Sequence, residues 1–273
     1  MEYHRETLLA ALPVLVLLAV LEALYLRAIK NQRYDWRESL ASLGVAIGGN
    51  LLRLVTVGIV ASGAQFAWQH RLVTLTPQQA GYWPALFVLE EFCYYWFHRF
   101  SHTCRWFWAT HAVHHSPNHF YLSGAYRLGW TGPLTGGLLF FSPLFLLGFK
   151  PEAVFMVLGS NLLYQYWLHT ELIGPLGHFD RIFNSPANHR VHHASLKPYL
   201  DKNFGGVLMV FDHLFNTYQT EDNTRPISQY GVRPALTSYN PITVAFHEWR
   251  RIAHDLQTAN GIKQWFWVLF GKP

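Results

Sequence analysis

Long apolar runs alternate with polar segments over the first two thirds of the chain. Residues 8–26 are almost wholly apolar, and about 20 helical residues are enough to cross a hydrocarbon core about 30 Å thick. Two further apolar stretches cover residues 40–68 and 82–100. Residues 128–149 and 152–168 are apolar as well, with a short Gly-Phe-Lys-Pro turn between them. The pattern predicts membrane helices, of which the last two form a hairpin that enters the membrane and returns, fully or in part.

The basic residues predict how these helices are oriented. The loop at residues 27–38 carries four basic residues, and short basic loops beside membrane helices favour the cytosol. The N-terminus is therefore expected to face outward. The first apolar run has a weak basic flank and no small-residue cleavage site, so we expect a retained helix rather than a signal peptide. Counting passes places the segments after residues 100 and 168 on the cytosolic side.

The composition fits a chain that is partly embedded in a membrane. Hydrophobic residues make up 51% and charged residues 14%, whereas a soluble domain carries about a quarter charged residues. The mean hydropathy of +0.07 is too low for a chain that lies wholly in lipid. The net charge of +5 is modest and no helix is dense in Lys and Arg, which argues against nucleic-acid binding. The two cysteines form no CxxC pair, so no cysteine-based zinc site is predicted.

The predicted fold is an all-α, multi-pass membrane bundle with a cytosolic, histidine-rich helical cap. We treat residues 1–273 as a single membrane domain with three parts. Residues 1–83 form the N-terminal membrane helices, residues 84–220 the histidine-rich region that would carry the chemistry, and residues 221–273 a cytosolic or interfacial tail. The apolar, aromatic run WFWVLF at residues 265–270 is expected to anchor this tail at the membrane interface.

Histidine is the residue type that stands out, with 16 copies in the chain. It forms an HxxxH at residues 98–102 and two HxxHH clusters at residues 111–115 and 189–193, while Gln165 and His169 make a weaker pair. A shuffled chain of this composition would contain an HxxHH with a probability of about 0.05, so composition does not explain two copies. Since positions i, i+3 and i+4 share a helix face, each cluster is expected to offer two or three imidazoles to one point. The candidate metal ligands are His98, His102, His111, His114, His115, Gln165, His169, His189, His192 and His193.

The type and number of these ligands predict two metal ions. Neutral imidazole suits Zn, Cu, Fe and Ni, and eight to ten imidazoles exceed what one ion accepts. The Glu-x-x-His pairs of soluble di-iron bundles are absent, and HEWRR at residues 247–251 lacks the second histidine of a zinc-protease motif. The residues by themselves leave open a membrane metal-binding or transport protein, a bis-histidine haem cytochrome, and a binding protein without oxidation chemistry. They do not separate iron from zinc.

The order of the three clusters on membrane helices resembles the fatty acid hydroxylase / sterol desaturase superfamily over roughly residues 84–220. Its alkylglycerol monooxygenase-like branch is the most similar, through YYWFHRFSH (94–102), WATHAVHHS (108–116), LLYQYWLHTELIGPLG (162–177), NHRVHHA (188–194) and LDKNFGGVLMVFDHLFNTY (200–218). The resemblance implies a membrane non-haem di-iron enzyme that hydroxylates or desaturates a lipid of fatty acyl, ether-lipid or sterol-like type. It also implies O₂ as co-substrate and an electron-transfer protein or other reductant as external electron donor. In related hydroxylases the position of Gln165 is often a histidine ligand, which implies a weak or water-bridged ligand here.

The chain departs from that branch at three places. Thr103 follows the first cluster where the branch has Glu, Pro117-Asn118-His119 follows the second where it has an acidic residue, and Arg127-Leu128 stands where it has Arg-Gln. These departures bear on the substrate and on any pterin dependence, and they leave the metal ligands unchanged.

Groups that orient the ligands are expected beside the clusters. Ligating histidines usually donate their second N–H to a carboxylate or a carbonyl oxygen. Asp180, Asn203 and Asp212 lie near the clusters in the sequence and are candidates for this role. The alternative is that they are ordinary surface residues or helix caps.

Overall fold

The computed structural model describes residues 2–222, 224, 227 and 229–273, with side chains from residue 13 onward. Within these ranges the chain forms no strand, and a lone antiparallel bridge joins Phe183 to Leu208. The predicted all-α fold is confirmed. The α-helices are α1 (Glu2–Ala28), α2 (Trp36–Gln69), α3 (Tyr82–Thr103), α4 (Arg105–His111), α5 (Leu138–Leu146), α6 (Pro151–Tyr164), α7 (Phe179–Ile182), α8 (Pro186–His193), α9 (Val210–Leu214), α10 (Pro241–Thr258) and α11 (Ile262–Phe270), and the 3-10 helices are η1 (Leu122–Tyr126), η2 (Gly132–Leu134) and η3 (Gln165–Leu168).

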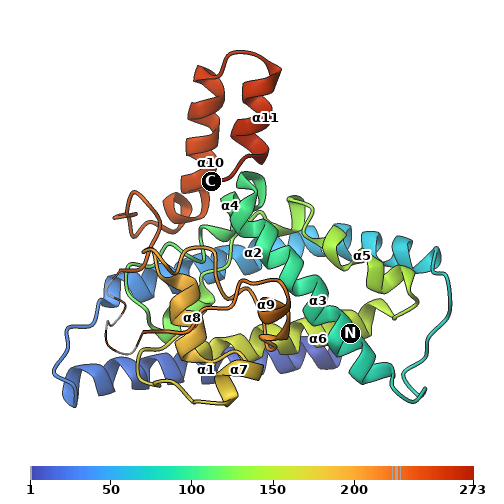
Figure 1. Cartoon of the computed structure of the whole chain (residues 1–273), viewed down its shortest axis with the longest axis horizontal. Coiled ribbons are helices and arrows are strands. Elements are labelled where there is room, and N and C mark those ends of the chain that lie inside the picture. Colours follow the sequence, from blue (N-terminus) through green and yellow to red (C-terminus); the bar gives the residue numbers. More distant parts are fainter. Residues whose placement is uncertain (1, 223, 225–226, 228) are drawn as a thin grey trace.

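The long helices set the shape of the molecule. Figure 1 shows α1 and α2 along the longest axis, with α3 running obliquely to them and the short helices α7, α8 and α9 near one another in the middle of the view. A separate hairpin of α10 and α11 projects from the body beside α4. The N-terminal helices thus form a frame against which the histidine-bearing segments are placed.

Helix α2 carries the clearest membrane signal. Its start is fixed by Asp35, whose carboxylate accepts hydrogen bonds from the backbone N–H groups of Arg37 and Glu38 at 2.9 and 3.2 Å. Of the helices in the described part of the chain, it alone is both long enough and apolar enough to cross a membrane. Leu54 and Val55 on it are 69% and 75% exposed, which is expected for side chains covered by lipid rather than protein.

The predicted hairpin at residues 128–168 is made of shorter helices than its apolar sequence suggests. Residues 128–137 form turns and η2, so that α5 begins only at Leu138. The nine residues of α5 are about 13 Å long, well short of a hydrocarbon core of about 30 Å. The first arm of the hairpin can therefore enter a membrane but not cross it.

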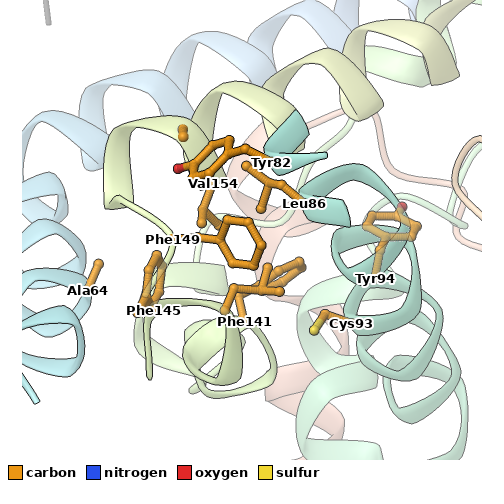
Figure 2. Close-up of a cluster of buried hydrophobic side chains, with 11 residues drawn as sticks. Ala64, Tyr82, Leu86, Cys93, Tyr94, Phe141, Phe145, Phe149 and Val154 are labelled. Carbon is orange, nitrogen blue, oxygen red and sulfur yellow. The ribbon is translucent and has the colours of Figure 1, made fainter. Parts of the chain in front are cut away.

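A buried apolar core holds α3 in place. Figure 2 shows side chains from α2, α3, α5 and α6 meeting at this point. The core residues are Ala64, Tyr82, Leu86, Cys93, Tyr94, Phe141, Leu144, Phe145, Phe149, Ala153 and Val154. Because this core fixes the first three turns of α3, the last two turns project rigidly beyond it and carry His98 and His102.

A glycine on α2 permits the close packing of the segment that follows the second histidine cluster. The indole N–H of Trp130 donates to the carbonyl oxygen of Val45 at 2.8 Å, and its ring lies directly over Gly48. A Cβ atom at Gly48 would overlap this ring, whereas a Cβ atom at Gly58 on the same helix would meet nothing within 4 Å.

We expect Gly48→Ala to lower the stability of the protein in detergent by about 1–3 kcal/mol, since the Trp130 ring has to move. The matched variant Gly58→Ala is expected to be neutral or to stabilise by up to about 1 kcal/mol through helix propensity. Thermal unfolding of both variants checks this. Equal midpoints for the two variants would contradict the packing of Trp130 on Gly48.

Candidate metal centre

Four segments deliver the histidines to one buried region. His98 and His102 lie one turn apart at the end of α3. His111 ends α4, and the turn after it carries His114 and His115. The second HxxHH cluster lies on α8, whose start is fixed by Ser185 as N-cap and by Pro186 in the first turn. His169 follows η3. All of these imidazoles except that of His111 are buried.

The nine histidines separate into two groups. The five-histidine group contains His98, His102, His111, His115 and His192. The four-histidine group contains His114, His169, His189 and His193. Within each group, one ring nitrogen of every residue lies within 4.8 Å of the others, so each group could hold a metal ion.

Each HxxHH cluster directs two of its three imidazoles to one group, as expected, and the third to the other group. His111 and His115 belong to the five-histidine group, but His114 belongs to the other. On α8 the division is reversed, since His192 joins the five-histidine group while its neighbour His193 joins the four-histidine group. Residues i and i+4 are about 40° apart around a helix whereas consecutive residues are about 100° apart, so the third imidazole diverges. Each cluster therefore contributes to both groups, and the rings of His115 and His193 stack across them at 4.1 Å.

The hydrogen bonds of the rings indicate tautomers that could bind a cation. The Nδ1 atoms of His114, His169 and His192 lie 3.3, 2.9 and 2.9 Å from backbone carbonyl oxygens. A carbonyl oxygen only accepts, so each Nδ1 carries the proton and each Nε2 carries a lone pair. The Nε2 atoms of His114 and His169 nevertheless face each other at 3.2 Å. Two lone pairs repel at this distance unless a cation lies between them.

The distances between neighbouring Nε2 atoms can be compared with those expected around a bound metal ion. Neighbouring Nε2 atoms within the two groups lie 3.0–3.2 Å apart. A tetrahedral zinc ion with bonds of about 2.0–2.1 Å would place them about 3.3–3.4 Å apart, and an octahedral ion with bonds of about 2.1–2.2 Å about 3.0–3.1 Å apart. His102 adds a buried Nε2 without a hydrogen-bond partner to the five-histidine group. The nitrogen atoms of each group are therefore close enough together to bind one metal ion.

Comparison with known proteins agrees with the histidine pattern. A family model described as fatty acid hydroxylase matches residues 83–217, which include every histidine of both groups. These residues form a fatty acid hydroxylase domain. No solved structure matches the chain.

Relatives of this fatty acid hydroxylase domain carry lipid-related names. Alkylglycerol monooxygenase of Homo sapiens is 34% identical over 268 residues, covering 96% of this chain and 58% of that protein. The Danio rerio alkylglycerol monooxygenase is 35% identical over 210 residues, covering 74% and 46%. Ornithine lipid hydroxylase OlsE of Rhizobium tropici is 32% identical over 143 residues, covering 50% and 43%. The chain thus spans about half the length of the curated relatives that it matches.

Two of the predicted orienting residues act on the ligands of the hydroxylase domain through the backbone. The carboxylate of Asp212 accepts hydrogen bonds from the backbone N–H groups of Phe204 and Gly205, both at 2.7 Å. The carbonyl oxygen of Phe204 in turn accepts from Nδ1 of His98 at 2.8 Å. The backbone of Asn203 has a φ of 57°. Its side chain donates hydrogen bonds to the carbonyl oxygens of Asn188 and Gln219 at 3.0 and 2.8 Å. Asp212 and Asn203 thus fix the loop whose carbonyl groups hold the ligands, rather than contacting the imidazoles directly.

The side chains of the other two predicted positions, Gln165 and Asp180, are hydrogen-bonded to other residues. The side chain of Gln165 accepts from the Tyr94 hydroxyl at 3.0 Å and donates to Asn161 at 2.5 Å, and only its backbone oxygen contacts a ligand, His169. One carboxylate oxygen of Asp180 accepts from the backbone N–H of Leu176 at 2.7 Å. Asp180 belongs to neither histidine group, and the Gln165 amide has Tyr94 and Asn161 as its partners.

Sequence reasoning missed Arg127. Its carbonyl oxygen accepts from Nδ1 of His114, and its buried guanidinium donates to the hydroxyls of Ser42 and Ser116 and to the carbonyl oxygen of Glu38. A single Arg at the edge of an apolar run was the available signal, because a buried guanidinium requires several acceptors. Arg127 thereby connects α2 to the four-histidine group.

Burial keeps the imidazoles neutral. It lowers the pKa of five ligands well below 6.5, namely His111, His115, His189, His192 and His193. It lowers the pKa of His114 to about 4. The pKa of Asp212 changes in the opposite direction, because burial raises it to about 6. Neutral imidazole is the form that binds a metal ion, so the folded site stays competent below the usual histidine pKa.

These shifts predict how the metal-depleted protein responds to acid. The unfolded chain takes up protons near pH 6.5 while the folded chain does not, so stability is full above pH 6.5 and falls as the pH drops toward the folded pKa values. Each buried imidazole contributes up to about 1.4 kcal/mol per pH unit, and Asp212 offsets one of them. Thermal unfolding of chelator-treated protein should show a midpoint that declines as the pH falls from 6.5 to 5. A constant midpoint down to pH 5 would contradict neutral, buried imidazoles.

Proposed function

We propose that this chain is a membrane di-iron oxygenase that hydroxylates a lipid, using O₂ and two electrons from an external reductant. The observation that carries the proposal is the pair of buried groups in which Nε2 lone pairs converge at 3.0–3.2 Å. The fatty acid hydroxylase domain and relatives named as a monooxygenase and a lipid hydroxylase support the reaction class.

Iron is the metal that suits both the donor sets and the reaction. Zinc has no redox chemistry and could not transfer electrons to O₂, which a monooxygenase must reduce. A transporter would place its ligands along a path through the membrane, whereas α2 contributes no ligand to either group. A bis-histidine haem needs single histidines on facing helices, not groups of five and four. These points favour the oxygenase over a transporter and a haem cytochrome, two of the alternatives that the histidines left open.

The residues of the chain have distinct tasks in this proposal. Nine imidazoles hold the ions, and the backbone carbonyl groups keep a proton on the Nδ1 atoms of His98, His114, His169 and His192 so that Nε2 faces inward. When bound, the iron pair would supply the activation of O₂ and the removal of hydrogen from a C–H bond. We do not assign Gln165 as a ligand, because its amide is occupied by Tyr94 and Asn161.

Aromatic side chains shield the histidines from water. Phe120 stacks on His169 with 5.6 Å between ring centroids and is covered in turn by Tyr230 at 5.0 Å. Trp108 lies against His102 and His115 at 5.3 and 5.6 Å. A dry surrounding protects a reactive oxidant from reaction with solvent and suits an apolar substrate.

The proposed substrate is a lipid with a hydrocarbon chain and a polar head. Hydroxylation consumes one O₂, two electrons and two protons for each C–H bond, and it places one oxygen atom in the product and the other in water. The names of the relatives refer to alkylglycerol and ornithine lipid, which share this amphipathic character. An electron-transfer protein or another reductant supplies the electrons.

The proposed location is an integral membrane one with the metal centre on the cytosolic face. The apolar, exposed surface of α2 supports a membrane span, and the basic loop at residues 27–38 supports a cytosolic position for its beginning. We propose that α1, α3 and the α5–α6 hairpin join α2 in the membrane, with the N-terminus outward.

The division of the histidines predicts the metal content of single variants. Purified protein supplied with iron should contain about two ions per chain. His192→Ala should lose about one ion from the five-histidine group, and His193→Ala about one ion from the four-histidine group. His254→Ala, at a site that is 75% exposed, is the control and should keep both. Unchanged iron in His192→Ala and His193→Ala, measured by elemental analysis, would contradict the assignment.

Labelled oxygen tests the reaction itself. Membranes that contain the iron-loaded protein, a reductant and an alkylglycerol or ornithine lipid should yield a product with one ¹⁸O atom from ¹⁸O₂ by mass spectrometry. His189→Ala should reduce the yield at least a hundredfold, since a ligand is missing. A new double bond without ¹⁸O would replace hydroxylation by desaturation, and no oxidised lipid would overturn the proposal.

A further inference from the structure

Helix α11 has a surface that is unusual for a helix in contact with water. Its sequence, IKQWFWVLF, is apolar on nearly every side, yet none of its residues is buried. Trp265, Phe266 and Trp267 are 52%, 56% and 61% exposed. A helix that is apolar all round normally lies in a protein core or in lipid, and the described part of the chain does not bury this one.

The base of the α10–α11 hairpin is attached to α2 at a defined level. The side chain of Pro241 at the start of α10 packs on Gly44, and the ring of Phe246 meets that of Trp130 with 5.7 Å between centroids. Trp130 in turn lies on Gly48 of α2. Two tight glycine contacts thus fix the position of the hairpin along α2.

The hairpin is attached close to the point on α2 at which charged residues end and a wholly uncharged stretch begins. The exposed Arg53 donates a hydrogen bond to Asn50 at 3.2 Å, and residues 54–69 contain no charged side chain. Arg53 is five residues from Gly48, or about 8 Å along the helix. Figure 1 shows α10 and α11 running across the direction of α2. If α2 crosses a membrane, the hairpin therefore extends along the membrane plane, close to the level at which the lipid begins.

The charges of the hairpin favour an anionic surface. Between residues 241 and 273 it carries four basic residues and two acidic ones, Glu248 and Asp255. Both acidic side chains are paired with Arg105, at 2.9 and 2.7 Å. Lys263 and Lys272 are exposed. Basic residues beside exposed aromatic ones are typical of helices that lie at the surface of an anionic membrane.

The hairpin is also fastened to the metal-bearing region. The backbone N–H of Arg105 donates to the carbonyl oxygen of Gly271 at 2.9 Å. Lys272 forms an ion pair with Asp201 at 2.6 Å, and Asp201 lies 3.8 Å from Nδ1 of His102. The C-terminal end of α11 is therefore held against the metal-bearing region.

We propose that α11 is an in-plane membrane helix, which inserts Trp265, Phe266 and Trp267 into the boundary between headgroups and acyl chains of an anionic leaflet. This inference rests on the part of the proposed function that places α2 across the membrane. It adds a second contact with lipid on the side of the molecule that holds the metal centre, and this contact sets the height of the centre above the bilayer.

Spin labels on the full chain test this placement. The label is attached at Trp267→Cys, with Phe266→Cys as a second position, in a Cys104→Ser background and in nanodiscs of phosphatidylcholine and phosphatidylglycerol. Power-saturation measurements compare relaxation by O₂, which concentrates in lipid, with relaxation by a water-soluble nickel chelate. Leu54→Cys on α2 is the lipid reference, and His254→Cys on α10 is the aqueous reference.

The expected result is a ratio of O₂ to nickel accessibility at positions 266 and 267 that is severalfold above that at position 254. Aqueous values at 266 and 267 beside a lipid value at 54 overturn the inference alone and leave the membrane span of α2 intact. Aqueous values at all four positions overturn that span as well. Labels at 266 and 267 that neither reagent reaches indicate a protein cover, such as a second copy of the chain, and also overturn the inference.

Discussion

The mutual repulsion of imidazole lone pairs in a dry interior governs the architecture of this protein. Where Nδ1 is bonded to a carbonyl oxygen, the inward Nε2 has no proton to share with its neighbour. The Nε2 atoms of His114 and His169 nevertheless approach to 3.2 Å, an arrangement that is favourable only around a cation. Binding a cation requires neutral imidazoles, and burial provides them by lowering the pKa values of His192 and His193 below 6.5.

The scaffold around the two groups keeps these rings from turning away. One support is the loop at residues 202–208, whose carbonyl groups hold His98 and His192. Asp212 holds one part of this loop. The buried Glu91 on α3 holds another, because its carboxylate accepts hydrogen bonds from the backbone N–H groups of Val207 and Leu208. Since each polar group that supports a ligand is itself satisfied, the position of an imidazole is determined through two successive layers of hydrogen bonds.

A second support connects the metal centre to the proposed membrane frame. Glu38 on α2 accepts hydrogen bonds from the backbone N–H groups of Asn118 and His119 at 2.7 and 3.1 Å, directly after the second histidine cluster. Glu22 on α1 does the same for Leu122 at 2.7 Å and also accepts from the hydroxyl of Thr170. The described side chains of these two helices belong to neither histidine group, yet they fix segments that carry candidate ligands. Apolar helices can thus serve a polar site by offering it a few buried carboxylates.

The sequence by itself determined the all-helical class, the nine candidate histidine ligands and the resemblance to the fatty acid hydroxylase family. These properties are local, because the i, i+4 spacing of His98 and His102 or of His189 and His193 places both rings on one face in any helix that forms. The division of each HxxHH cluster between two groups was decided by the tertiary structure, since it depends on how α3, α4, α8 and η3 meet. The roles of Gln165 and Arg127 were decided there as well. Every residue has a backbone carbonyl oxygen, so the sequence cannot indicate which of these oxygens orient a candidate ligand. Only the folded chain determines that.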